Sequence, residues 1–422
     1  MLECIQRESF QYFPGETQSQ NGLVADKTDA ASPCSIAAVG LALASYPAGV
    51  ERGYVTRRAG ALSTLKTLKF FKASPQGSEP DATGYKGFYY HFLDMKTGRR
   101  TWDCELSTMD TALFIAGALT AAAYFDHQNE TETQIRKLAD ELYRRIDWHW
   151  ALNRGASVTH GWKPKTGFLR YRWLGYNEAA LLYILGLGSP TYPLPADSYR
   201  AWTSTFKWKK LYGKELLHAG PLFIHQLSHC WIDFRGIQDA LMKARGIDYF
   251  ENSRRATYIQ QEYAVRNPHG FAHYGKSCWG ITASDGPGPG LRKIRGIQRK
   301  FFGYRARGVP FGPDDGTISP WAVVASLPFA PEIVLPTIRY FIEEIRLKDR
   351  QAYGFEASFN ATFPEKTKNP FGWVSPYIFG LNEGPMVLMI ENFRSELIWQ
   401  LTRKCPYILR GLRRAGFSGG WL

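Results

Sequence analysis

The chain has 422 residues, of which 44% are hydrophobic and 21% are charged, a balance typical of a globular protein with a sizeable core. No run of eighteen apolar residues occurs, which argues against a transmembrane helix. The formal net charge of +14 is spread along the chain without a continuous Lys/Arg block, so the sequence predicts neither a nucleic-acid partner nor a membrane partner.

The first residues, "MLECIQRESFQYF", carry Glu3 and Glu8 in a helical pattern and lack the apolar region of a signal peptide. We therefore expect either a cytoplasmic protein or the trimmed form of a periplasmic or secreted one. The six cysteines are widely separated and form no CxxC pair, which favours free thiols over a zinc knuckle or a disulfide framework.

Helical periodicity recurs along the chain and predicts an all-α fold. The predicted helices cover residues 3–13, 35–46, 56–71, 107–125, 131–149, 178–187, 221–229, 235–244, 250–265, 319–327, 331–346 and 384–404. Strand signals are confined to "GFYYHFLD" and "GFLRYRW", which indicate hairpins in loops. Residues 276–316 are rich in Gly, Pro and Arg and predict a long functional loop.

Since no low-complexity linker divides the chain, we expect one domain over residues 1–422. About a dozen helices would suit an (α/α)6 toroid with six inner and six outer helices, and the loops at one end of such a ring would form a pocket.

One predicted helix begins with acids, in "WDCELSTMDTALFIAG". Asp110 lies beside an apolar stripe that includes Leu106 and Leu113, where burial would raise its carboxyl pKa and suit it to proton transfer. The same residues also fit a capping box, with Ser107 as N-cap and Asp110 at the third helical position. The stretch alone leaves both interpretations open.

Further acids lie near predicted loop–helix junctions, and each alone is explained by a helix cap or a turn. They are Glu105, Glu178, Asp285, Asp314, Asp315 and Glu383. Six aromatic residues accompany them: Trp102, Trp173, Tyr176, Trp279, Trp321 and Trp373. Aromatic faces stack on sugar rings and a pair of carboxyls is the minimum for glycosidic cleavage, so together these residues predict an oligo- or polysaccharide substrate.

Other chemistries lack their motifs, since there is no GxxxxGK[ST], no GxGxxG after a strand, no GxSxG and no HExxH. His225 and His229 have the i, i+4 spacing of a helical metal pair, but no acid lies between them, and Asp233 would join them only if the helix continued. We expect neither a metal nor a cofactor.

Long runs of the sequence resemble the bacterial glucoamylase-like domain family, which includes the endo-β-1,2-glucanases of glycoside hydrolase family 144. Among these runs are "ELSTMDTALFIAGALTAAAYF", "GYNEAALLYILGLGSPTYPLP" and "GPDDGTISPWAVVASLPFAPE". The resemblance covers nearly the whole chain. It implies an (α/α)6 toroid and inverting hydrolysis of β-1,2-glucan to short sophoro-oligosaccharides.

The family pattern E-x-S-x-x-D is matched by Glu105, Ser107 and Asp110, and its GYNEA places Glu178 where the family has a cleft glutamate. One position departs from the pattern: where the family has Asp-Gln-Gly-Pro, this chain has Asn382 followed by Glu383. Asn382 cannot act as an anion.

We therefore predict an inverting glycoside hydrolase, a monomer, in which Glu178 is the acid and Asp110 acts as the base or orients the water. Glu105 would hold a sugar hydroxyl or an arginine, and the remaining acids and aromatic residues would contact substrate. The alternatives are a glucoamylase-type α-glucan hydrolase, a glycan-binding protein impaired at Asn382, and a nucleic-acid-binding protein whose affinity falls steeply with salt.

Overall fold

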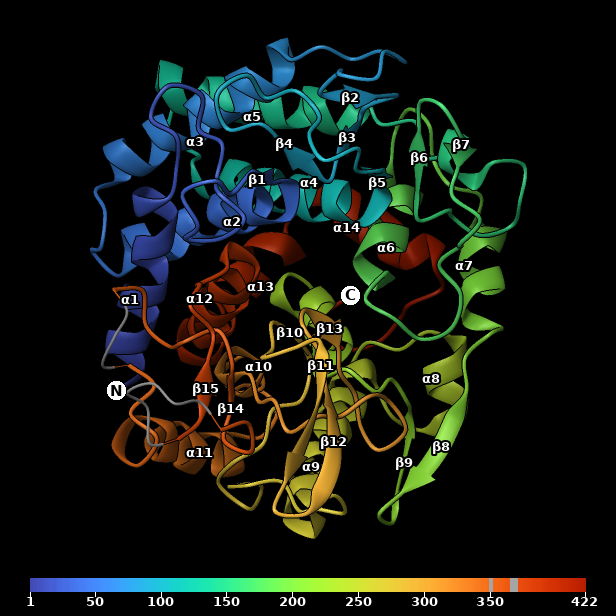
Figure 1. Cartoon of the computed structure of the whole chain (residues 1–422). Helices are drawn as coiled ribbons and strands as arrows, with labels where there is room; N and C mark the ends of the chain where they lie inside the picture. Colours follow the sequence, from blue (N-terminus) through green and yellow to red (C-terminus); the bar gives the residue numbers. More distant parts are fainter. Residues whose placement is uncertain (349–351, 365–370) are drawn as a thin grey trace.

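The computed structural model describes residues 1–348, 352–364 and 371–422, which form a mostly helical protein with small sheets (Figure 1). The α-helices are α1 (Leu2–Gly15), α2 (Ile36–Glu51), α3 (Arg57–Ala73), α4 (Thr108–Tyr124), α5 (Glu130–Arg144), α6 (Ala180–Gly188), α7 (Ala196–Thr203), α8 (Ala240–Arg245), α9 (Tyr249–Arg266), α10 (Pro320–Val324), α11 (Pro331–Glu343), α12 (Gly380–Ser395), α13 (Leu397–Arg403) and α14 (Pro406–Arg414). Short 3₁₀ turns are η1 (Trp150–Leu152), η2 (Leu222–His225) and η3 (Leu227–Cys230).

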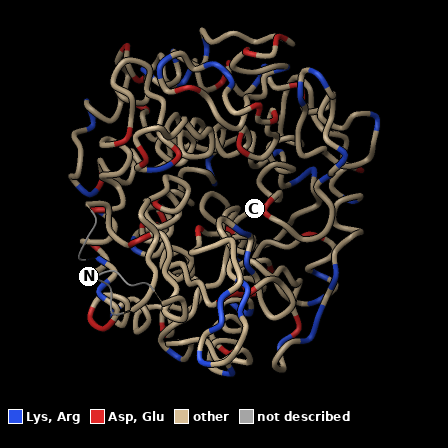
Figure 2. The backbone as a smooth tube through the Cα atoms, viewed as in Figure 1, with Lys and Arg blue, Asp and Glu red and all other residues tan. Residues whose placement is uncertain are grey.

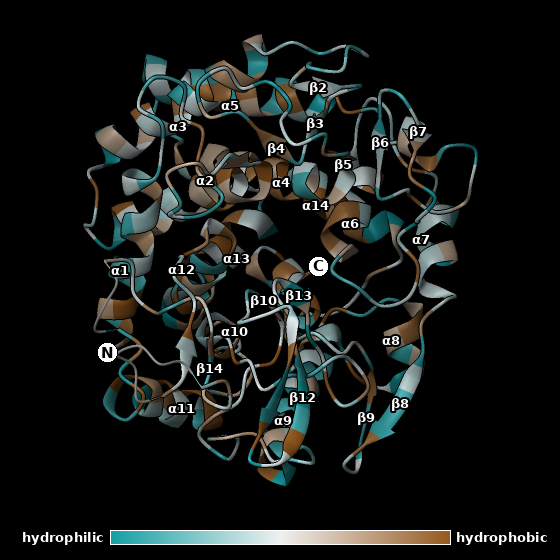
Figure 3. Ribbon diagram, in the orientation of Figure 1, coloured by the Kyte–Doolittle hydropathy of each residue, from teal (hydrophilic) through white to brown (hydrophobic). Residues whose placement is uncertain are grey.

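The helices fall into two classes by burial. Helices α2, α4, α6, α10 and α12 are buried on most or all sides, whereas α1, α3, α5, α9 and α11 bury one face and expose the other. A helix that is apolar all round belongs inside a protein and an amphipathic helix belongs at its surface. The second class covers the first, since α5 packs on α4 and α1 packs on α12. Figure 3 shows the contrast in hydropathy between α2 and α4 inside and the polar strands at the periphery.

Helices α2 and α4 cross in close contact because glycine occupies the crossing point. A Cβ atom added to Gly117 would lie 1.9 Å from the carbonyl oxygen of Gly40, and one added to Gly40 would lie 2.3 Å from the carbonyl oxygen of Leu113. Neither position leaves room for a side chain.

The strands are short. They are β1 (Cys34–Ser35), β2 (Gly84–Tyr85), β3 (Phe88–Tyr90), β4 (Phe92–Leu93), β5 (Leu106–Ser107), β6 (Gly161–Lys163), β7 (Gly167–Phe168), β8 (Trp208–Leu211), β9 (Lys214–Leu217), β10 (Ala283–Ser284), β11 (Gly290–Ile294), β12 (Ile297–Phe301), β13 (Arg305–Ala306), β14 (Phe359–Asn360) and β15 (Trp373–Val374). An antiparallel sheet has the order β2-β3-β5-β6-β7, and the remaining strands form antiparallel pairs.

Two strands lead directly into inner helices. β1 pairs with β4, placing Ser35 opposite Phe92, and β5 pairs with β3, placing Leu106 opposite Tyr90. Because β1 runs into α2 and β5 runs into α4, these pairings bring the first turns of the two helices to the same segment, residues 88–93.

Most predicted helices are confirmed within a few residues, but three predictions need correction. Residues 221–229 form the 3₁₀ turns η2 and η3, the helix predicted at 235–244 shrinks to α8, and residues 384–404 divide into α12 and α13. The division occurs at Glu396, which has a left-handed φ of 59°. Helices α7 and α14 were not predicted.

The predicted loop at residues 276–316 contains four strands, β10 to β13. Its β11–β12 hairpin carries Arg292, Lys293, Arg299 and Lys300, and Figure 2 shows this basic segment at the periphery. The strand-like run "GFYYHFLD" does not form one hairpin, because β3 and β4 join different sheets.

A large hydrophobic cluster extends from Ile5 to Phe417 and includes residues of all the inner helices, and a small second cluster contains Leu216, Ala256 and Ile259. All six cysteines carry free thiols. Over the described ranges, no helix is both long enough and apolar enough to cross a membrane.

Candidate active site

A cavity of about 340 Å³ opens where the first turns of several inner helices meet. It is lined by Asp26, Ser35, Ala37, His91, Phe92, Met109, Asp110, Leu113, Glu178, Phe223, Leu227, Ala283, Tyr304, Trp321, Phe379, Leu381 and Asn382. Three carboxyl groups thus share one largely apolar pocket. Among them, Asp110 belongs to α4, Glu178 lies two residues before the start of α6, and Asp26 lies in the loop before α2.

His91 is held by its backbone between two helix starts. Its N–H donates to the carbonyl of Glu105 at 2.9 Å, and its own carbonyl accepts from the N–H of Ile36 at 3.2 Å. The residue therefore connects the strand that enters α4 with the first residue of α2.

The imidazole of His91 lies between two carboxylates. Nδ1 is 3.0 Å from Oε1 of Glu105, Nε2 is 3.4 Å from Oδ2 of Asp110, and the ring stacks on Phe92 with centroids 4.1 Å apart. Burial alone would lower the pKa of His91, but the charges of Asp110 and Glu105 outweigh burial and raise it to about 9. The hydrogen bond from His91 holds the pKa of Glu105 at about 2. At neutral pH the ring is a cation and Glu105 is an anion.

Asp110 uses its backbone and its side chain for different purposes. Its N–H donates to Oγ of Ser107 at 3.1 Å, so Ser107 caps α4 as predicted. The Asp110 carboxylate does not close the capping box, because it is directed toward His91 and the pocket. Asp110 can therefore donate its N–H to the Ser107 cap and also direct its carboxylate into the pocket.

Glu178 is held at the pocket by the turn that precedes α6. The N–H of Ala179 donates to Oδ1 of Asn177 at 3.1 Å, and the Ser228 hydroxyl donates to the carbonyl of Glu178 at 2.8 Å. Burial, reinforced by the charge of Asp110, raises the pKa of the Glu178 carboxyl to about 7. Glu178 is therefore substantially protonated at neutral pH.

Of the residues predicted from the sequence, Asp110, Glu178 and Trp321 line this pocket. Glu105 adjoins it through His91. Trp102 lies beside it, because its ring centroid is 5.1 Å from that of the lining residue Phe92, and 61% of its surface is exposed.

Three residues predicted to contact substrate have buried side chains and do not line this pocket. Trp279 is fully buried and donates from Nε1 to Thr337. Asp315 forms a fully buried ion pair with Arg307 at 2.7 Å. Glu383 is fully buried, and its pKa is raised well above the usual range by burial and by the charge of Glu8.

Five further predicted contacts lie outside the pocket lining: Trp173, Tyr176, Asp285, Asp314 and Trp373. Trp173 is a core residue, since it stacks on His160 and donates from Nε1 to Thr108 at 3.0 Å. Asp314 accepts hydrogen bonds from the hydroxyls of Tyr263 and Tyr274. The contact of these five residues with substrate stays a prediction.

Sequence reasoning missed Asp26, His91 and Tyr304. Tyr304 is 60% exposed, and its loop is anchored by the buried Arg307, which donates to the carbonyls of Phe302 and Gly303. The long loop did suggest a functional role for this segment, whereas nothing in the local sequence distinguished Asp26 or His91.

His225 and His229 are buried on η2 and η3 rather than on one α-helix. Nε2 of His225 lies 3.3 Å from the carbonyl of Ala219, and Nε2 of His229 lies 2.9 Å from the hydroxyl of Ser253. Burial lowers both pKa values to about 3, so the rings are neutral. These contacts explain the pair as part of the core.

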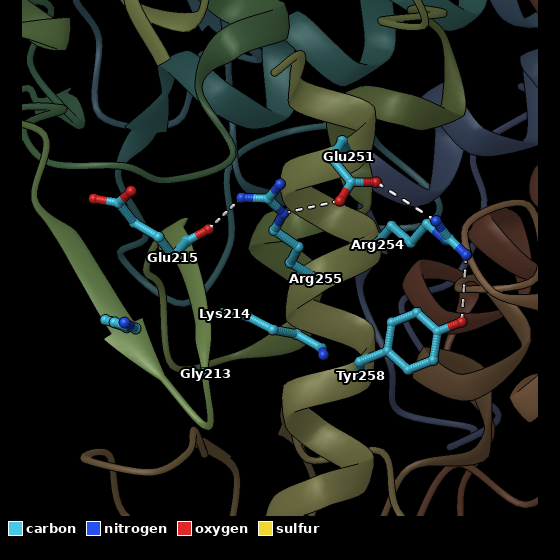
Figure 4. Close-up of a pocket in the computed structure, with 8 residues that line it drawn as sticks. Gly213, Lys214, Glu215, Glu251, Arg254, Arg255 and Tyr258 are labelled. Atoms are coloured by element: carbon cyan, nitrogen blue, oxygen red, sulfur yellow. Dashed lines mark hydrogen bonds and ion pairs between the residues drawn. The ribbon is translucent and has the colours of Figure 1, made fainter. Parts of the chain in front are cut away.

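A second, open hollow of about 770 Å³ lies between the β8–β9 hairpin and α9 (Figure 4). Its acidic groups are paired with arginines: Glu251 pairs with Arg255 at 2.8 Å and with Arg254 at 3.7 Å, and the carboxylate of Glu215 pairs with Arg245 at 3.1 Å. Because both carboxylates lie among arginines at the surface, this hollow lacks a desolvated acid.

Residues 170–406 match the Glycoamylase family model, which is described as "Putative glucoamylase". The chain belongs to the Glycoamylase family. A Bacteroides uniformis structure described in the same words is 32% identical, with a TM-score of 0.87 over 100% of this chain and 98% of the other. A second similar structure is an endo-β-1,2-glucanase from Chitinophaga pinensis in complex with sophorotriose and glucose, with 26% identity, a TM-score of 0.86 and coverage of 100% and 98%.

A curated relative, the exo β-1,2-glucooligosaccharide sophorohydrolase (non-reducing end) of Parabacteroides distasonis, is 27% identical over 448 residues. The match covers 98% of this Glycoamylase-family chain and 57% of the relative. The chain thus spans little more than half the length of that protein.

Proposed function

We propose that this protein is a glycoside hydrolase that cleaves β-1,2-glucan. The observation that carries the proposal is that Glu178 and Asp110 share one pocket in opposite electrostatic surroundings. Glu178 is desolvated and retains a proton near neutral pH, whereas Asp110 faces the cationic ring of His91. Glycosidic hydrolysis requires a pair of carboxyls, one of which donates a proton to the leaving oxygen. We infer the β-1,2 linkage of the substrate from relatives that are named for action on β-1,2-glucan and its oligosaccharides.

The mechanism that the family resemblance implies for this pair is inversion. Glu178 donates its proton to the glycosidic oxygen as the bond to the anomeric carbon breaks. A water on the opposite face of the sugar ring attacks that carbon, and Asp110 orients this water. Glu105 is too acidic to exchange protons near neutral pH, so it stabilises the charge of His91 instead.

We propose in addition that residues 1–422 form one (α/α)6 toroid. Its support is the pocket itself, which receives residues from the first turns of α2, α4, α10 and α12, from the turn before α6, and from η2 and η3. With η2 and η3 counted as one segment, these are six chain segments that converge at their N-terminal ends, which matches the inner ring of such a barrel. The amphipathic helices outside them match its outer ring.

Incubation with linear β-1,2-glucan, laminarin, cellulose and starch tests the substrate. We expect new reducing ends from β-1,2-glucan alone, and the first sugar released should be the α-anomer by NMR because the reaction inverts configuration. Products from starch alone would favour a glucoamylase-type activity, and a β-anomeric first product would exclude inversion.

A second candidate function is glycan binding without hydrolysis. The observation that favours it is Asn382, which lines the pocket where the family pattern has an aspartate. This candidate predicts saturable binding of sophoro-oligosaccharides in calorimetry, with no new reducing ends at any pH between 4 and 9.

A further inference from the structure

We propose that Asp26 is a further catalytic carboxylate of this pocket and accepts the proton of the attacking water. The inference rests on the proposed hydrolytic function and adds to it the destination of that proton.

Asp26 is held in place by its backbone and not by its side chain. Its N–H donates to the carbonyl of Pro33 at 2.8 Å, and its carbonyl accepts from the N–H of Gly380 at 2.9 Å. Gly380 is the first residue of α12, so Asp26 is fixed beside the helix turn that carries Asn382. Its side chain lines the same cavity as Glu178 and Asp110.

The Asp26 carboxylate has no hydrogen-bond donor from residues 1–348, 352–364 or 371–422. The nearest lysine in sequence is engaged elsewhere: Nζ of Lys27 lies 3.5 Å from Asp29 and 4.1 Å from the ring centroid of Tyr377. Asp26 is partly buried, and a partly desolvated carboxylate without a protein donor costs free energy; such groups concentrate at functional sites.

The charged and titratable groups that face Asp26 come from several elements. The charges of Lys27 and His91 favour the ionised form of Asp26, and the charge of Asp110 opposes it. The charge of Asp26 in turn raises the pKa values of Tyr12, Cys34 and Tyr304. Burial has the largest effect and raises the pKa of Asp26 to about 6. Asp26 is therefore ionised at neutral pH and yet more basic than Glu105, whose pKa is about 2. A stronger base accepts a proton more readily in the transition state.

Asp110 and Asp26 then have different tasks. Asp110 is tied to His91 through the 3.4 Å contact and is suited to orienting the water. Asp26, which has no such tie, is suited to accepting its proton. Because Asn382 cannot take up a proton as a carboxylate does, Asp26 supplies this capacity on the same side of the pocket.

The step is balanced in atoms and charge. The water oxygen forms a bond to the anomeric carbon while one water proton passes to Asp26. The bond between that carbon and the glycosidic oxygen breaks, and the leaving oxygen receives the proton of Glu178. Asp26 ends protonated and Glu178 ends ionised, and exchange with solvent restores both.

The test compares Asp26→Asn with Asp29→Asn on whichever glucan the parent protein cleaves. Asp29 lies in the same loop, has 31% of its side chain exposed, and accepts the N–H of Ala31 through an oxygen that asparagine retains. We expect Asp26→Asn to lower kcat by a factor of about 10² or more, to leave KM within threefold, and to remove the acidic limb of the pH profile. Asp29→Asn should match the parent.

A second variant, Asp26→Ala, tests the role by chemical rescue. Azide needs no proton acceptor, so it should restore turnover to Asp26→Ala and yield the α-glycosyl azide, whereas Glu178→Ala should gain nothing.

Parent-like kcat in a folded Asp26→Asn would overturn this inference and leave the proposed function intact. Loss of the fold in both Asp26 variants would assign it a structural role and overturn the inference equally. A parent protein that cleaves none of the four glucans would overturn both proposals.

Discussion

Nδ1 of His91 lies 3.0 Å from Oε1 of Glu105. Glu105 directly precedes β5, which leads into α4, and the carbonyl of His91 accepts the N–H of Ile36, the first residue of α2. The charge of Asp110 and the contact with Glu105 together outweigh burial and raise the pKa of His91 to about 9, while the hydrogen bond from His91 lowers that of Glu105 to about 2. The contribution of the raised His91 pKa to stability is complete below the ordinary histidine pKa of 6.5 and is lost as the pH rises through about 9. The lowered pKa of Glu105 likewise stabilises the folded protein: this contribution is complete above the ordinary pKa of 4.5 and is lost as the pH falls through about 2.

We therefore expect His91→Gln to lower the melting temperature most between about pH 5 and 6.5 and progressively less as the pH approaches 10. Thermal melts of both proteins from pH 5 to 10 measure this difference. His127→Gln, at an exposed position 3.8 Å from Glu132, is the control. A pH-independent difference for His91→Gln would show that the ring stabilises by packing alone.

Glu178→Gln should retain the parent melting temperature and lower kcat by a factor of about 10² or more, because glutamine fills the same volume but has no proton to donate. In the parent, activity should decline as the pH rises through about 7, where Glu178 ionises. Steady-state rates at several pH values measure both effects. A stable Glu178→Gln variant with parent turnover would end the assignment of Glu178 as the acid.

The cap and the carboxylate of Asp110 can be tested separately. Ser107→Ala removes the acceptor of the Asp110 N–H and should lower the free energy of unfolding by about 1 kcal/mol, as measured by urea denaturation. Asp110→Asn keeps that backbone bond, so we expect nearly unchanged stability and a fall in kcat of about 10². The reverse pattern, with Asp110→Asn unstable but active, would indicate a purely structural role.

The buried pair of Arg307 and Asp315 should dominate the stability of the loop that carries Tyr304. Asp315→Asn leaves the Arg307 charge uncompensated and should lower the free energy of unfolding by about 3–5 kcal/mol in urea denaturation. Arg254→Gln removes an exposed ion pair with Glu251 and should cost less than about 1 kcal/mol. Similar losses in the two variants would contradict the special role of the buried pair.

Trp102 offers an exposed aromatic face beside Phe92. If it stacks on a sugar ring, Trp102→Ala should raise KM by roughly two- to tenfold with kcat and melting temperature unchanged. Kinetics on sophoro-oligosaccharides of increasing length would show the effect appear only when the chain is long enough to reach this residue. An unchanged KM at every length would remove Trp102 from the binding surface.

The parts of the fold that local sequence predicts well are the long apolar helices. In α2 and α4 the periodicity and the serine caps agree, so both helices were located within a few residues, except that α2 continues through Pro47 and ends five residues beyond its predicted end. The turns η2 and η3 escaped prediction because the apolar pattern of residues 221–229 also fits an α-helix.

The site was only partly accessible to sequence reasoning. Asp110 and Glu178 have a local signature, as acids at the start of apolar helices. Asp26 and His91 have none, since their positions depend on backbone contacts with Pro33, Gly380 and Ile36 that the local sequence does not reveal. Aromatic residues such as Trp279 suit a core as well as they suit a sugar, and only burial separates the two uses.

The contact between Gly40 and Gly117 makes the spacing of the pocket acids sensitive to positions that no substrate touches. Gly117 lies seven residues beyond Asp110, or roughly 10 Å along α4 at the usual helical rise. A methyl group there has to push α2 and α4 apart, and the displacement would widen the gap between Asp110 and the elements around the start of α2. The close approach of the two glycines thus helps to set the width of the pocket, although neither glycine lines it. Substitutions that change this width would alter selectivity for glucans of different bulk.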